Sequence, residues 1–146
     1  MSNEAPQQRR GSADASQAEE RRRRLAEGMD AFNRGDTAAV LAIFDPGVET
    51  HIDARLMNPG TRTGHDGYLE MVGAWNEAWG SIEVELVDVS EPDESHMLTE
   101  VRQRATGAGS GVPVEMRLFW LFEFDGGLVT RFHMYPDRDS ALAAVP

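Results

Sequence analysis

Apolar and polar positions alternate most clearly in the last third of the chain. Two apolar runs between residues 112 and 137 flank the tripeptide Asp125-Gly126-Gly127. Asp-Gly and Gly-Gly in such a place are strong signals for a β-hairpin, because glycine adopts positive φ angles without steric cost. We therefore predict two long antiparallel strands. The first strand carries one wholly apolar face, formed by Met116, Leu118, Trp120 and Phe122.

The opposite face of this first strand also carries large apolar side chains. Phe119 and Leu121 lie there between Arg117 and Glu123. A strand that is apolar on both sides is not a half-solvated edge strand. We expect one face to meet a core or pocket and the other face to meet something else, such as a second subunit.

The returning strand of the hairpin carries polar and apolar side chains in alternation. Arg131, His133 and Tyr135 share one face, and Phe132 and Met134 share the other. The alternation alone leaves two interpretations open for the polar row. It faces either a cavity or water.

The remaining pattern predicts a mixed fold of one domain. Helical or alternating spacing indicates helices at 16–34, 37–44, 65–79 and 137–144, and strands at 48–55, 81–89 and 96–106. Residues 1–15 are polar, so we expect a disordered tail before a domain at 16–146. The strands cluster late and are joined by hairpins, which is typical of an α+β fold with a curved antiparallel sheet. Helices across the concave side of such a sheet make a cone with one internal pocket.

Composition and charge exclude several kinds of chemistry. The chain has no cysteine, and all 14 of its basic residues are arginine. A thiol nucleophile, a thiolate metal site and a lysine Schiff base are therefore excluded. The formal net charge of -11 argues against nucleic acid as a partner, because phosphate binding needs a positive surface. No apolar run approaches the ~20 residues of a membrane span, and the N-terminus lacks a signal peptide's apolar region, so we expect a cytoplasmic protein with no membrane partner.

Two segments outside the hairpin carry candidate site residues. The strand at 48–55 places His51 and Asp53 on one face, either solvated or projecting into a cleft where they share a proton network. The helix at 65–79 carries Tyr68, Trp75 and Trp79 at helical spacing. Such aromatic stripes form core in most proteins, but each side chain also suits the wall of a small-molecule pocket.

Three motifs together resemble one known family. They are Phe32-Asn33-Arg34-Gly35-Asp36, the tripeptide Arg62-Thr63-Gly64, and the block from Gly111 to Leu142 with its Tyr135-Pro136-Asp137 segment. The chain resembles the SnoaL-like group of the nuclear transport factor 2-like superfamily over about residues 19–144. The resemblance implies a cone whose pocket lies between the sheet and the first and third helices. It also implies a homodimer through the convex sheet face, which would cover Phe119 and Leu121.

The superfamily includes isomerases, epoxide hydrolases, dehydratases, polyketide cyclases and non-catalytic binders. The resemblance places His51 where ketosteroid isomerases carry their carboxylate base. Gly28 and Trp120 stand where those enzymes carry a tyrosine and a protonated aspartic acid. Steroid isomerisation by that set of residues is therefore not supported. A fold hosts chemistry but does not define it.

We expect an apolar, oxygenated small molecule as the ligand and a cofactor-independent acid–base reaction, such as isomerisation, dehydration, cyclisation or hydrolysis. The resemblance turns the polar row toward the concave side, so the expected catalytic residues are His51 as base, Asp53 and His133. The expected substrate-binding residues are Arg55, Tyr68, Trp75, Trp79, Arg102, Met116, Leu118, Trp120, Phe122, Arg131 and Tyr135.

Two other interpretations stay open. A non-catalytic ligand-binding or accessory domain is favoured by the loss of the superfamily's acid–base groups. A metal site is suggested by His51, Asp53 and His133, because two histidines and a carboxylate suit zinc or iron. No HExxH or similar spacing supports a metal, so we expect none.

Overall fold

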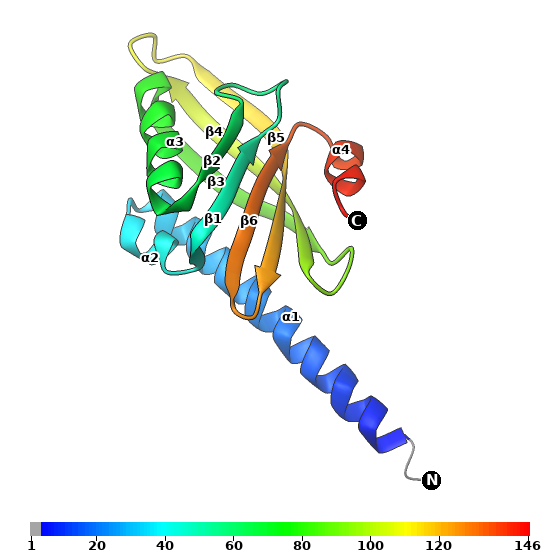
Figure 1. Cartoon of the computed structure of the whole chain (residues 1–146). Helices are drawn as coiled ribbons and strands as arrows, with labels where there is room; N and C mark the ends of the chain where they lie inside the picture. Colours follow the sequence, from blue (N-terminus) through cyan, green and yellow to red (C-terminus); the bar gives the residue numbers. More distant parts are fainter. Residues whose placement is uncertain (1–3) are drawn as a thin grey trace.

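The computed structural model describes residues 4–146, and the side chains from residue 15 onward. Figure 1 shows the arrangement of the described helices and strands. Their order is α1 (Glu4–Asn33), α2 (Thr37–Leu41), β1 (Phe44–Ile52), β2 (Gly60–Thr63), α3 (Gly64–Ala78), β3 (Trp79–Ser90), β4 (His96–Gly107), β5 (Pro113–Asp125), β6 (Leu128–Tyr135) and α4 (Arg138–Ala143).

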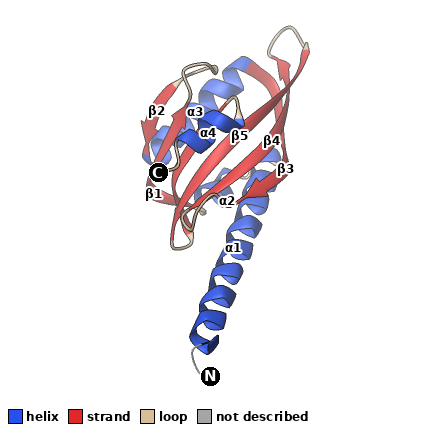
Figure 2. Cartoon of the chain, turned by 90° about the vertical axis from the view of Figure 1, so that its right-hand side faces the viewer, coloured by secondary structure: helices blue, strands red, loops and turns tan. Residues whose placement is uncertain are grey.

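The six strands form one curved sheet in the order β2-β1-β6-β5-β4-β3. Neighbouring strands are antiparallel except β1 and β6, which are parallel. Helix α3 and the C-terminal half of α1 cover the concave side, while α4 lies on the convex side (Figures 1 and 2). The predicted α+β class with a curved sheet around helices is confirmed. The parallel pair was not predicted, and the sheet stays open between β2 and β3 instead of closing into a barrel.

Several predicted boundaries differ from the structure. Helix α1 begins at Glu4, so it covers most of the segment predicted to be disordered, and residues 1–3 lie outside the described residues. Strand β1 begins at Phe44 and includes the predicted turn at 45–47, because an irregularity between Phe44 and Glu49 absorbs those residues. The predicted loop at 56–63 contains β2, which pairs with the end of β1.

Pairing across the β5–β6 hairpin decides which side chains share a face. Phe122 pairs with Phe132, and Trp120 pairs with Met134. The alternate positions pair Leu121 with His133 and Phe119 with Tyr135. Directly opposed residues project to the same side of a sheet. The apolar residues of β6 therefore face the concave core, and its polar residues face the convex side.

The convex side has a small apolar core of its own under α4. Leu98, Phe119, Leu121, Tyr135 and Ala141 are all buried there. Phe119 keeps 8% of its surface exposed and Leu121 keeps 4%. The interpretation that these two side chains lack a partner within the chain is therefore wrong. Helix α4, which the pattern did predict, packs back onto the sheet and covers them.

Candidate functional site

An apolar cavity lies inside the cone, between the concave sheet face and helices α1 to α3. We call it the inner chamber. Its free volume is about 40 Å³, room for a few water-sized groups. Its walls are formed by Leu25, Gly28, Met29, Phe32, Val40, Ile43, Phe44, Tyr68, Trp75, Val84, Trp120, Phe122 and Phe132.

A second cavity, the outer chamber, adjoins the inner one, because the Trp75 side chain lines both. Its volume is about 140 Å³. An engineered apolar cavity of ~150 Å³ in another protein takes up benzene, so this volume suits a single ring. The walls are Ile52, Leu56, Met57, Trp75, Trp79, Gln103, Met116, Leu118 and Met134.

Almost no polar side chains line the two chambers. Tyr68 is the one titratable residue among their walls, and burial raises the pKa of its phenol, which keeps it a neutral donor. Gln103 is the one polar residue of the outer wall. No histidine, aspartate or glutamate lines either described chamber. Trp120 is 5% exposed, and its indole Nε1 has no hydrogen-bond partner among the described residues.

Seven of the predicted substrate-binding residues line these chambers. They come from α3, its C-terminal boundary and β5: Tyr68, Trp75, Trp79, Met116, Leu118, Trp120 and Phe122. Apart from Trp79, the first residue of β3, the walls that α1, α2 and β3 contribute were not predicted as site residues. Met29, Phe32 and Val40 carry only the ordinary helical spacing of core residues, which gives no separate signal for a cavity. The sequence pattern placed Phe132 and Met134 on the apolar face of β6, but they were not predicted as site residues.

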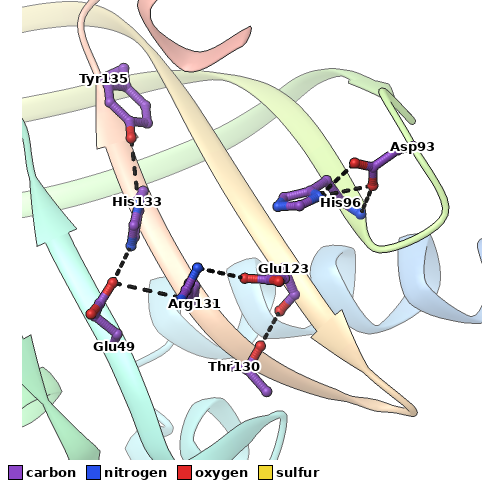
Figure 3. Close-up of polar contacts among 8 residues, drawn as sticks. All are labelled: Glu49, Asp93, His96, Glu123, Thr130, Arg131, His133 and Tyr135. Carbon is purple, nitrogen blue, oxygen red and sulfur yellow. Dashed lines mark hydrogen bonds and ion pairs between the residues drawn. The ribbon is translucent and has the colours of Figure 1, made fainter. Parts of the chain in front are cut away.

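The remaining predicted site residues lie on other surfaces. The convex side carries His51 on β1 and Arg131, His133 and Tyr135 on β6. Figure 3 shows the three β6 residues. The prediction that this row shares a cavity with Trp120 is wrong, because the hairpin pairs His133 with Leu121 rather than with Trp120. In the strand predicted at 48–55, His51 is half-buried on the convex side and does not line either chamber.

The polar side chains on the convex face form a connected group, which we call the convex polar cluster. His133 Nε2 donates to Glu49 Oε2 at 2.8 Å, and the Tyr135 hydroxyl donates to His133 Nδ1 at 3.4 Å (Figure 3). The His51 and His133 rings lie 5.2 Å apart between centroids. Burial lowers the pKa of His133, and this effect outweighs the neighbouring Glu49 carboxylate, which acts to raise it. The bonds and the lowered pKa describe a neutral imidazole.

Asp53, Arg55 and Arg102 are engaged in surface ion pairs. Arg55 bonds Asp53 Oδ1 at 2.9 Å and Asp137 Oδ2 at 3.0 Å, which ties the end of β1 to the start of α4. These bonds to Arg55 lower the pKa of Asp53. Arg102 donates to Glu85 at 3.2 Å. Within residues 15–146, whose side chains the structure describes, no three His, Asp or Glu side chains are grouped closely enough to hold a metal ion.

Comparison with solved structures identifies the same fold. An NTF2-like protein of unknown function from Burkholderia pseudomallei K96243 gives a TM-score of 0.73 at 18% identity, over 86% of this chain and 97% of that chain. TerC, co-crystallized with polyporic acid, gives 0.73 at 16%, over 83% and 94%. The epoxide hydrolase/cyclase-like enzyme SalBIII, with a role in pyran ring formation in polyether salinomycin, gives 0.70 at 15%, over 84% and 94%.

Comparison at the level of sequence supplies the family. No curated protein matches the chain. In the described part of the chain, no helix is both long and apolar enough to cross a membrane. A model of the SnoaL-like domain matches residues 25–132, which is more than half of the chain and includes the walls of both chambers except Met134. The chain therefore belongs to the SnoaL-like domain family.

Proposed function

We propose that this protein binds a small, neutral and largely apolar molecule inside the cone, and that the cone interior serves binding rather than acid–base catalysis. The composition of the chamber walls carries the proposal. A general base must lie within hydrogen-bond reach of the proton that it removes. The walls offer a neutral phenol, three indoles and an amide, but no imidazole or carboxylate.

The likeness to known structures supports a small molecule as the ligand. TerC was co-crystallized with polyporic acid, and SalBIII acts in pyran ring formation. The chambers of this chain limit the size of its own ligand. The outer chamber, at about 140 Å³, fits one ring, and the inner chamber beside it is smaller. The outer chamber is also well below the ~300–1,000 Å³ typical of drug-sized sites.

Calorimetric titration with neutral single-ring aromatic compounds tests the proposal. We expect saturable binding at one site and a rise in melting temperature, because a ligand of the folded state stabilises it by mass action. Leu118→Trp adds bulk to the outer wall and should weaken binding at least about tenfold, since overpacking displaces the ligand. His133→Gln, on the opposite side of the sheet, is the matched control and should bind like the wild type. If Leu118→Trp binds normally and His133→Gln loses binding, the ligand site lies on the convex face and not inside the cone.

Acid–base catalysis on the convex face is a second candidate function. The 2.8 Å bond between His133 and Glu49, with His51 beside it, favours this candidate, because a carboxylate that orients an imidazole is a common element of general-base sites. The role of His51, Asp53 and His133 in catalysis stays a prediction. If the protein turns over a substrate there, His133→Gln should lower kcat at least about a hundredfold, whereas Leu118→Trp should leave kcat unchanged.

A homodimer through the convex face and a cytoplasmic location also stay predictions. Because α4 covers Phe119 and Leu121, we place the dimer contact on the open part of that face between β3 and β5. This part carries cross-strand ion pairs such as Arg102 with Glu85 and Arg117 with Glu100. Light scattering should show a dimer that dissociates in ~1 M salt, because exposed charge pairs are screened there. A chain that stays monomeric at low salt contradicts this contact.

A further inference from the structure

Trp120 carries an unused hydrogen-bond donor inside the apolar core. The side chain is 5% exposed and lines the inner chamber. Its ring packs against Phe132 with centroids 5.1 Å apart, and its Nε1 has no acceptor among the described residues. Nearly all buried donors in folded proteins have a partner, because an unpaired one loses its hydration without compensation.

The walls of the inner chamber contain little that could satisfy this donor. Apart from the Trp120 and Trp75 indoles, Tyr68 contributes the one polar side chain among them. A trapped water molecule needs two to four polar partners, and it finds few in an apolar space of about 40 Å³. The missing acceptor is therefore best supplied by the molecule that the cone binds.

We infer that Trp120 Nε1–H donates a hydrogen bond to a neutral carbonyl oxygen of the ligand, and so selects carbonyl compounds over hydrocarbons of the same shape. This inference rests on the proposed binding function. The acceptor is neutral because no cation lines either chamber, and a carboxylate buried against a single neutral donor would lose most of its hydration. With aromatic walls and a ring-sized outer chamber, the ligand class is a small aryl or cyclic ketone.

Two probes of nearly equal shape isolate the hydrogen bond. Acetophenone and α-methylstyrene differ in one group, C=O in the first and C=CH₂ in the second. The ratio of their dissociation constants is measured by calorimetry for the wild type and for Trp120→Phe, which keeps an aromatic ring but removes the N–H. Differences in hydration between the probes cancel when the two ratios are compared. We expect the preference for acetophenone to fall about five- to tenfold in Trp120→Phe.

Trp79→Phe is the matched control, since it removes an indole N–H from the outer wall instead. It can change both affinities but should leave their ratio unaltered. In the ¹⁵N-labelled wild type, the Trp120 indole N–H resonance should move downfield with acetophenone and much less with α-methylstyrene, which tests the contact even if Trp120→Phe fails to fold. Equal ratios in wild type and Trp120→Phe, with both probes bound, overturn the role of Trp120 and leave the binding function intact. Failure of the wild type to bind either probe overturns both.

Discussion

His133 lies in the C-terminal half of β6 with its imidazole half-buried on the convex face. Glu49 and His51 approach it from β1, and Arg131 and Tyr135 flank it on β6. Burial is the main cause that lowers its pKa below the ordinary value. His51 and Arg131 act in the same direction, and the Glu49 carboxylate acts to raise it. The folded chain therefore binds fewer protons at this site than the unfolded chain.

This lowered pKa predicts a pH-dependent contribution to stability. The stabilisation by neutral His133 is complete above the unfolded pKa of about 6.5 and is lost as the pH falls through the lower folded pKa. The free energy of unfolding of the wild type should therefore fall relative to that of His133→Gln between pH 7 and pH 5. Urea denaturation of both proteins over this range measures the difference. A difference that stays constant with pH would contradict the neutral, buried imidazole.

At the scale of elements, α4 is fixed to the sheet by its first turn. Asp137 accepts a hydrogen bond from Ser140 N at 2.8 Å, which caps the helix, and also pairs with Arg55. Below the helix, Ala141 packs into the small convex core, and the Arg138 guanidinium lies 5.2 Å from the centre of the Phe119 ring. Loss of the cap should therefore expose part of this core.

Substitutions at Asp137 separate the two roles of its carboxylate. Asp137→Ala removes both the cap and the ion pair and should lower the melting temperature by about 2–4 °C. Asp137→Asn keeps a capping oxygen and loses only the exposed ion pair with Arg55, so its melting temperature should fall clearly less. Calorimetric melting of the three proteins is the measurement. An equal fall in melting temperature in both variants would show that the ion pair, not the cap, fixes α4 to the sheet.

The periodicity of the sequence was sufficient to predict most helices and strands, but not how they pair and pack. The Asp125-Gly126-Gly127 hairpin and the aromatic stripe of α3 were predicted from local pattern, and with them seven chamber residues. The orientation of β6 was not predicted correctly, because pairing slips by one residue between Glu123 and Phe124. Such a slip exchanges the faces of a strand, and local sequence does not encode it. The parallel β1–β6 contact and the covering of Phe119 by α4 depend on distant segments in the same way.

At the scale of the whole molecule, the curved sheet separates two environments. Its concave side, closed by α1 and α3, is apolar and holds both chambers. Its convex side holds the convex polar cluster, the cross-strand ion pairs and α4. A ligand inside the cone cannot touch His51 or His133, because the backbone of the sheet lies between them. The two candidate functions therefore belong to opposite sides of one sheet and can be distinguished by the position of a bound molecule.

The most direct test of binding inside the cone is the position of bound acetophenone, measured by nuclear Overhauser contacts between the probe and the labelled protein. Binding inside the cone should give contacts from the acetophenone methyl and ring protons to Leu118, Met134 and Trp75, on the concave side. No contacts to His51, His133 or Tyr135 are expected. Contacts to the convex residues without contacts to the chamber walls would show that the ligand binds on the other side of the sheet and not inside the cone.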